Sequence, residues 1–160
     1  MRTRFRQYRH ASVLPTSADF ELASRYLANE LLALFRDQHP RDAVHSAATA
    51  RWLIEHDQAE NDLVVAGLLH DVAKGNQRRV DRVAWVLAAY VGMGSRLADA
   101  ESRFELRRAM ARTAEHSAAG ARLLLQAGAT PAVAELTRLH HTAPGTHRVL
   151  ALLQQADAAN

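Results

Sequence analysis

The sequence predicts an all-α fold, a helical bundle of about six to eight helices. Apolar residues recur at intervals of three and four along most of the chain from residue 17 onward, which is the period of an amphipathic helix. No stretch alternates apolar and polar residues convincingly, as a half-buried strand would. Proline and glycine stand where helices are expected to begin and end, as at Pro40, Pro131 and Gly128.

The first predicted helix covers residues 17–37, and Thr16 or Ser17 can cap its start. Its apolar stripe consists of Phe20, Ala23, Leu27, Leu31 and Leu34. A second helix is expected to begin at Pro40 and to break near Asp57. Its buried side is predicted to carry Val44, Ala47, Ala48, Trp52 and Leu53.

The third predicted helix covers residues 63–73, with Asn61 or Asp62 as its cap and Gly75 as its end. It is apolar on every side, which predicts a central position in the bundle. Further helices are expected over residues 77–90, 95–110, 113–126, 130–140 and 145–158.

Length and composition predict one domain with one core. The chain has 160 residues, of which 48% are hydrophobic, and we assign residues 17–160 to a single domain. Residues 1–16 are rich in arginine and lack a clear period, so they are predicted to form a flexible basic lead-in. The absence of cysteine excludes disulfides and cysteine-based metal, redox or nucleophile chemistry, and it suits a cytoplasmic protein. Neither a secretory signal nor a membrane span is expected.

The basic residues are dominated by arginine. The net charge is +3, and nineteen of the twenty basic side chains are arginine. This modest excess could favour an anionic partner such as a nucleotide. The wealth of alanine and arginine instead indicates a general compositional bias, so nucleic-acid binding is not expected, and Arg78, Arg79 and Arg82 are interpreted as a solvated face. The single lysine, Lys74, follows Asp71 by three residues.

Five of the nine histidines fall within predicted helices among apolar neighbours: His45, His70, His116, His140 and His141. His70 is followed directly by Asp71, and Asp157 follows a run of leucines near the end of the chain. A buried carboxylate beside an imidazole is costly unless a metal or a salt bridge compensates it. Each residue taken singly is as consistent with a core histidine or a surface aspartate, but the whole set is less plausible as coincidence.

The donor types indicate which metals such a site would bind. Imidazole nitrogens and carboxylate oxygens without thiolates suit Fe, Mn, Ni or Zn. The six or seven candidate ligands exceed the needs of one tetrahedral ion and suit two octahedral ions that share a bridging carboxylate. Two ions about 3.5–4 Å apart can generate a hydroxide and hold the phosphoryl oxygens during an in-line displacement.

The order of these residues resembles the HD superfamily of metal-dependent phosphohydrolases in its two-metal form. The strings GLLHDVAK, EHSAAGARLLLQAG, LHHTAPG and LLQQADAAN are similar to the family's segments around the paired histidine and aspartate, the third histidine, the closing histidines and the last aspartate. The similarity extends from about residue 40 to residue 160. It implies an HD-domain helical bundle that acts on a small phosphorylated substrate, most readily a nucleotide.

The resemblance also implies roles for individual residues. Residues of one metal site would be His45, His70, Asp71 and Asp157. Asp71 would bridge to a second metal held by His116 and by His140, His141 or both. Lys74 matches a lysine that lies near the substrate phosphate or the bridging hydroxide in several branches, so Asp71 and Lys74 are the predicted catalytic residues. The cofactors would be two divalent ions, with Fe or Mn ahead of Zn, Ni and Mg, and a homodimer is compatible with this interpretation.

The branch of the superfamily is less well defined. The branch that hydrolyses cyclic di-GMP carries a Gly-Tyr-Pro motif, whereas His141 is followed here by Thr-Ala-Pro-Gly. That branch often has a glutamate where this chain has Arg41, so neither a third metal nor this activity is expected. The closing string is similar to that of the hydrolases of diadenosine tetraphosphate but is one residue longer. Two alternatives stay open: a mixed-valent di-iron oxygenase, and a non-catalytic HD module for signalling or binding.

Overall fold

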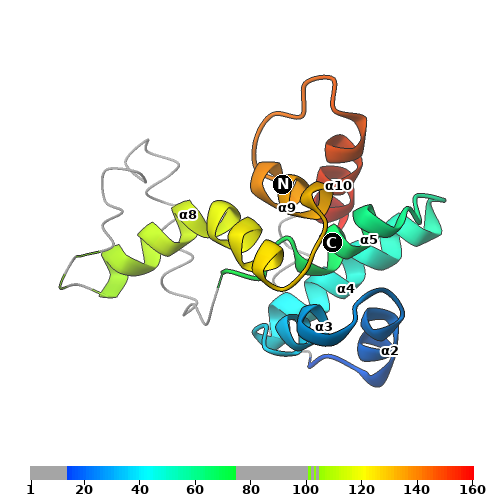
Figure 1. Ribbon diagram of the computed structural model, residues 1–160, viewed down its shortest axis with the longest axis horizontal. Coiled ribbons are helices and arrows are strands. Elements are labelled where there is room, and N and C mark those ends of the chain that lie inside the picture. The colour runs from blue at the N-terminus through cyan, green and yellow to red at the C-terminus, as the bar shows by residue number, and fades with distance from the viewer. Residues whose placement is uncertain (1–13, 75–100, 102, 104) are drawn as a thin grey trace.

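A computed structural model describes residues 14–74, 101, 103 and 105–160, with side chains described from residue 115 onward in the long helix that starts at residue 105. The described residues form seven helices and no strand, which confirms the all-α prediction. In chain order they are α2 (Ser17–Tyr26), α3 (Asn29–Arg36), α4 (Pro40–Glu55), α5 (Asn61–Leu69), α8 (Glu105–Gln126), α9 (Pro131–Leu139) and α10 (Arg148–Ala159) (Figure 1). None of these helices combines the length and the apolar character that a membrane crossing requires.

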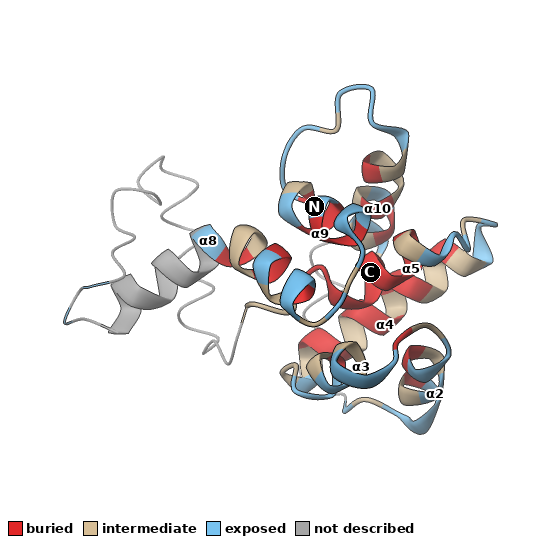
Figure 2. Ribbon diagram, viewed as in Figure 1, coloured by how far each residue is buried: buried red, intermediate tan, exposed pale blue. Residues whose placement is uncertain are grey.

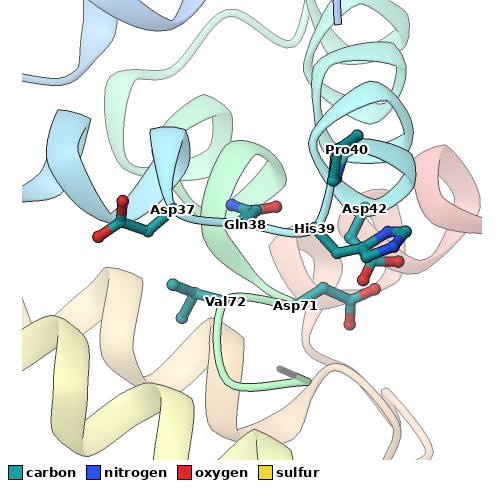
Figure 3. Close-up of a pocket in the computed structure, with 7 residues that line it drawn as sticks. All are labelled: Asp37, Gln38, His39, Pro40, Asp42, Asp71 and Val72. Carbon is teal, nitrogen blue, oxygen red and sulfur yellow. The ribbon is translucent and has the colours of Figure 1, made fainter. Parts of the chain in front are cut away.

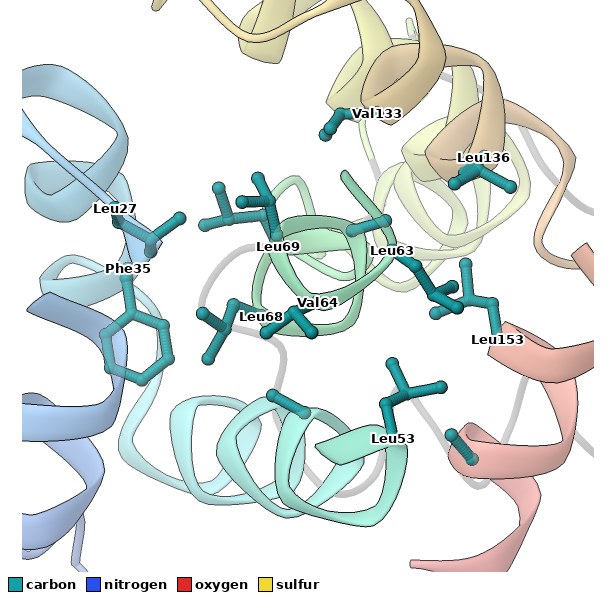
Figure 4. Packing of buried hydrophobic residues seen from close by; sticks show 14 of the residues in the cluster. Leu27, Phe35, Leu53, Leu63, Val64, Leu68, Leu69, Val133, Leu136 and Leu153 are labelled. Atoms are coloured by element: carbon teal, nitrogen blue, oxygen red, sulfur yellow. The ribbon is translucent and has the colours of Figure 1, made fainter. Parts of the chain in front are cut away.

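Helix α5 occupies the centre of the bundle, as its uniformly apolar sequence predicts. Every residue from Leu63 to Leu69 is buried, and the buried positions of the other helices face it (Figure 2). Figure 4 shows α5 surrounded by α4, α9, α10 and the two N-terminal helices. Helix α8 extends away from this group and contacts α9 with its C-terminal part (Figure 1). The core therefore gathers around the segment that leads directly into His70.

Small residues allow α4 and α5 to approach each other closely. A Cβ atom on Gly67 would lie 3.1 Å from Leu53 Cδ1 and 3.5 Å from Ala50 Cα, so a glycine suits this crossing. The facing side of α4 carries the buried alanines Ala43, Ala47 and Ala50. This close packing holds His45 of α4 near the end of α5.

The prediction of one helix over residues 17–37 was wrong. The chain breaks after Tyr26, where Leu27 is extended (φ −114°, ψ 133°), and Asn29 adopts a left-handed φ of 48° that asparagine tolerates better than most residues. In one straight helix, Phe20 and Phe35 would lie roughly 22 Å apart along the axis. The break instead brings their ring centroids to 6.1 Å, in an edge-to-face contact against the core.

Other helix boundaries differ from the sequence prediction in three places. Helix α5 ends at Leu69 rather than at residue 73, and Glu60 precedes it without a side-chain capping bond. Helix α8 continues through residues 110–113, where two helices were predicted. Helix α10 begins at Arg148, three residues later than expected, because His147 Nδ1 accepts a hydrogen bond from Leu150 N there.

The remaining boundaries follow the prediction closely. Pro40 and Pro131 stand at the starts of α4 and α9, and Thr130 caps α9 by accepting a hydrogen bond from Val133 N. The predicted helix over residues 77–90, half of that over 95–110 and most of the basic lead-in lie outside the described residues.

A partly buried ion pair joins α2 to α4. Asp19 closes a capping box with Thr16 and also contacts the Arg51 guanidinium, while its own exposure is 4%. Burial alone would raise the pKa of Asp19, but the hydrogen bonds from Thr16 and Arg51 outweigh burial and lower it. The stabilisation is therefore present above the ordinary pKa of 3.8 and is lost as the pH falls through the folded-state value.

We expect Asp19→Ala to lower the free energy of unfolding by about 1–3 kcal/mol at pH 7, because it removes a cap and leaves Arg51 without its carboxylate. Urea unfolding measured from pH 7 down to pH 3 should show the gap between the two proteins closing with acidity. Glu135→Ala, which breaks an exposed pair with Arg138, is the control and should have little effect. A gap that stays constant with pH would contradict this account.

Candidate metal centre

Seven predicted ligands converge although they come from five separate parts of the fold. They are His45 of α4, His70 and Asp71 after α5, His116 of α8, His140 and His141 at the end of α9, and Asp157 of α10. They form two groups, in each of which the ligand atoms lie within 4.8 Å of one another. The first group holds His45, His70 and Asp157, and the second holds Asp71, His116, His140 and His141.

The first group is centred on the Asp157 carboxylate. His45 Nε2 lies 2.7 Å from Asp157 Oδ1, and His70 Nε2 lies 3.5 Å from the same oxygen. The two imidazole rings meet nearly edge to face, with centroids 5.6 Å apart. Two nitrogens therefore converge on one carboxylate oxygen, although 112 positions separate His45 from Asp157.

The second group brings three imidazoles to one carboxylate oxygen. His116 Nε2 lies 3.4 Å from His140 Nε2 and 3.2 Å from His141 Nε2. Asp71 Oδ1 lies 3.5 Å from His140 Nε2 and 3.7 Å from His116 Nε2. The three Nε2 atoms thus face a common space, in which their lone pairs would repel one another.

Asp71 joins the two groups. Its Oδ1 atom faces the second group, while its Oδ2 atom lies 3.5 Å from His70 Nε2 of the first. The same Oδ2 atom accepts a hydrogen bond from the Lys74 ammonium. One carboxylate therefore faces both groups, with one oxygen toward each.

The turn after α5 aims His70 and Asp71 at the site. Val72 N donates to Leu69 O at 3.1 Å, so the chain tightens and the carbonyl of Leu68 loses its helical partner. Gln38 Nε2 donates to that carbonyl at 3.0 Å, and Gln38 Oε1 accepts from Ser46 Oγ at 3.1 Å. Gln38 thereby ties the end of α5 to α4, beside His45. Sequence reasoning missed this residue, since nothing local distinguishes it from other polar residues between helices.

Backbone carbonyls orient two of the imidazoles. The Nδ1 atom of His70 lies 3.0 Å from Gly67 O, and that of His140 lies 2.6 Å from Thr137 O. A proton donated from Nδ1 leaves Nε2 free to act as a ligand, which is the usual support for metal-bound histidine. Gln154 of α10 adds a further tie, since its Nε2 donates to the carbonyls of His140 at 3.0 Å and Thr142 at 2.6 Å.

A glycine brings α8 into reach of the site. A Cβ atom on Gly120 would lie 3.3 Å from Thr137 Cγ2 and 3.6 Å from Val72 Cγ1, so α8 packs closely against α9 and the turn after α5. His116 lies four residues before Gly120 and so shares this face of the helix. The predicted third histidine is consequently buried, at 3% exposure.

The two aspartates are held as carboxylates. Burial alone would raise the pKa of Asp71, but the positive charges of His70 and Lys74 outweigh burial and hold it well below its usual range. The pKa of Asp157 is lowered in the same way, because the hydrogen bond from His45 and the nearby positive charge of His70 overcome its burial. Both side chains therefore keep the negative charge that a cation would neutralise.

The pKa values of two imidazoles, those of His70 and His141, are shifted in opposite directions. Burial alone would lower the pKa of His70, but the carboxylates of Asp71 and Asp157 overcome it, so the pKa is raised. Burial and the neighbouring His140 and His116 lower the pKa of His141 to about 4. His141 is accordingly neutral at neutral pH, as a metal ligand must be.

The donor set fits divalent cations. Two buried atoms of the candidate ligands, His70 Nε2 and Asp71 Oδ1, have no hydrogen-bond partner among the described residues. An unsatisfied buried polar group costs about 1–3 kcal/mol, and a cation placed between these nitrogens and oxygens would remove that cost. Imidazole and carboxylate donors suit borderline divalent metals.

Comparison with protein families identifies the chain. The family model described as the HD domain matches residues 36–159. The chain belongs to the HD domain family. The HD domain is typical of a superfamily of metal-dependent phosphohydrolases, whose members bind divalent metals. The resemblance inferred from the sequence is therefore confirmed. No curated protein and no solved structure matches the chain.

The matched segment includes all seven candidate ligands and Lys74. The structure therefore brings every site residue predicted from the sequence into one region of the HD domain. The three arginines interpreted as a solvated face (Arg78, Arg79 and Arg82) lie outside the described residues.

Gln38→Leu should destabilise the HD domain by about 1–3 kcal/mol, because it leaves the Leu68 carbonyl and the Ser46 hydroxyl without their partner. Since the turn that carries His70 and Asp71 would loosen, we also expect roughly tenfold weaker Mn²⁺ binding. Urea unfolding and calorimetric titration with Mn²⁺ measure the two effects. Gln58→Leu removes an exposed bond to His56 O and serves as the control. Metal affinity equal to that of the wild type would show that Gln38 does not support the site.

Proposed function

We propose that this HD domain protein hydrolyses a phosphate ester or anhydride of a small, nucleotide-like substrate. The observation that carries the proposal is the position of Asp71, whose two oxygens face the two groups of candidate ligands. Such an arrangement suits a pair of divalent ions, which is the commonest machinery for in-line displacement at phosphorus. The absence of cysteine also suits a cytoplasmic enzyme. The proposed enzyme is a single domain over residues 17–160.

We assign His45, His70, Asp71 and Asp157 to one metal site. The second site would use Asp71 with all three of the remaining histidines: His116, His140 and His141. The sequence left open whether His140, His141 or both take part. Their ring centroids lie 3.9 Å apart, and each has Nε2 within 3.4 Å of His116 Nε2, which supports both. Fe or Mn is the proposed native metal, because both accept mixed imidazole and carboxylate ligands.

Two bound divalent ions would supply a hydroxide at neutral pH and neutralise the phosphoryl oxygens. Lys74 adds a positive charge on the opposite side of Asp71 from the second group, since its ammonium contacts Oδ2. With 23% of its side chain exposed, Lys74 can also reach a phosphate oxygen at the solvent side of the site. In the net reaction, the oxygen of water bonds to phosphorus as the bond to the leaving oxygen breaks. The leaving oxygen then takes up a proton.

Asp71→Ala should lower kcat/KM for phosphate release by roughly 100- to 1,000-fold, because both metal sites lose their shared ligand. The assay uses protein loaded with Fe²⁺ or Mn²⁺ and a panel of nucleotides and dinucleotides, and elemental analysis follows the bound metal. Metal content should fall together with activity. Asp62→Ala, at the opposite end of α5, is the control.

Unchanged activity in the Asp71→Ala protein would refute the proposed mechanism. Oxygen consumption without phosphate release would instead assign the site to oxidative chemistry.

Lys74→Met should lower kcat/KM by about 10- to 100-fold, because the phosphate loses a nearby positive charge. Metal binding should not weaken, since Lys74 is not a proposed ligand and its ammonium competes with cations for Asp71 Oδ2. Titration with Mn²⁺ and steady-state kinetics separate the two effects, and Lys74→Arg should restore part of the activity. Metal loss in Lys74→Met equal to that in Asp71→Ala would contradict a role in substrate binding.

A further inference from the structure

A pocket of about 240 Å³ adjoins the candidate metal centre. The connection between α3 and α4 forms one side of it, and the turn after α5 forms the other (Figure 3). Its polar lining, within the described part of the chain, consists of Asp37, Gln38, His39, Asp42 and Asp71. Because Asp71 belongs both to this lining and to the metal centre, whatever occupies the pocket lies next to the reacting phosphate.

The size of the pocket limits its occupant. Pockets that enclose a whole drug-sized ligand have volumes of roughly 300–1,000 Å³. A volume near 240 Å³ suits one part of a substrate, such as a single ring with its substituents. Pro40 and Val72 supply its apolar surface, against which the carbon skeleton of a ring can pack.

The charge of the lining excludes a phosphate as the occupant. The carboxylates of Asp37 and Asp42 line the pocket in addition to the proposed metal ligand Asp71, and these two would repel an anion. The phosphoryl group therefore belongs outside the pocket, near the histidines and the Lys74 ammonium that also surround Asp71. The pocket is left for the part of the substrate that carries no negative charge.

The hydrogen-bonding groups specify the chemistry further. His39 caps α4, and its Nδ1 accepts from Arg41 N at 3.3 Å, so the neutral imidazole carries its proton on Nε2 and can donate from there. His39 and Asp42 lie at the same end of the pocket as the Asp71 carboxylate (Figure 3). One donor beside carboxylate acceptors matches hydroxyl groups, which both donate and accept. An ammonium group would leave the His39 donor without an acceptor.

The lining also argues against a nucleobase in this position. Among the residues that the structure describes, those that line the pocket include no phenylalanine, tyrosine or tryptophan on which a base could stack. The amide of Gln38 is already bonded to Leu68 O and Ser46 Oγ, so it bounds the pocket rather than recognising the ligand by hydrogen bonds. A polyhydroxylated ring of the size of a pentose satisfies the polar and the apolar parts of the lining together.

We propose that this pocket binds the hydroxyl-bearing, sugar-like part of the phosphate substrate and thereby determines specificity. The inference rests on the proposed phosphohydrolase function and adds the class of group attached to the phosphate. His39 and Asp37 are specificity residues in this scheme, and neither belongs to the metal-ligand groups.

The test measures binding without turnover. Mn²⁺-loaded protein is titrated calorimetrically with the methylene phosphonate analogue of ribose 5-phosphate and with ethylphosphonate, whose carbon–phosphorus bonds resist hydrolysis. We expect the ribose analogue to bind about tenfold more tightly or better, as one or two hydrogen bonds to charged groups would give. His39→Asn and Asp37→Asn should each remove most of that difference and leave ethylphosphonate binding unchanged.

His147→Asn is the matched control. His147 caps α10 through Nδ1 just as His39 caps α4, but it does not line the pocket. Asparagine is a good capping residue, so His39→Asn and His147→Asn should both leave the melting temperature nearly unchanged. The control should keep the full preference for the ribose analogue.

Equal affinity for the two phosphonates, or no binding of either, would overturn the proposed subsite. Equal weakening of both phosphonates by His39→Asn and Asp37→Asn would overturn it as well. Failure of the proposed reaction has a different signature: no phosphate is released from any ester while the preference for the ribose analogue persists.

Discussion

The burial of the Asp71 carboxylate is the constraint on which the rest of the site depends. With 2% exposure, this charge has lost nearly all of its hydration, and such a loss is costly unless positive charge or hydrogen-bond donors surround it. Imidazoles from the end of α5, from α8 and from α9 face it, together with the Lys74 ammonium. Every helix that contributes a ligand must therefore reach the end of α5, and the packing of the bundle follows from that requirement.

Two kinds of local adjustment make this convergence feasible. Gly67 and Gly120 remove side chains where α4 crosses α5 and where α8 meets α9, so the backbones approach more closely than larger residues would permit. Gln38 satisfies the carbonyl that α5 leaves open when it ends at Leu69. The tight turn that follows lets two adjacent residues, His70 and Asp71, serve one site, although neighbours on a continuous helix would point about 100° apart.

The surroundings of Asp71 also divide the site by charge. The second group of histidines faces its Oδ1 atom and the Lys74 ammonium contacts its Oδ2 atom, and under the proposed function the bound cations and Lys74 would attract the phosphate. Asp37 of the α3–α4 connection and Asp42 in the first turn of α4 line the adjoining pocket, and their carboxylates favour uncharged donors. A phosphate ester of a sugar is polarised in the same sense, with an anionic end and a hydroxyl-rich end. In the proposed function, one buried carboxylate would thus bear on metal binding, phosphate binding and specificity.

The sequence by itself determined the all-α class, most helix starts and the seven candidate ligands with Lys74, because helical period, capping chemistry and donor type are local properties. The tertiary structure decided the break after Tyr26, the end of α5 at Leu69 and the division of the ligands into two groups. It also decided the role of Gln38, whose bond to Leu68 joins residues 30 positions apart. These features depend on contacts between distant segments, and such contacts leave no periodic pattern in the chain.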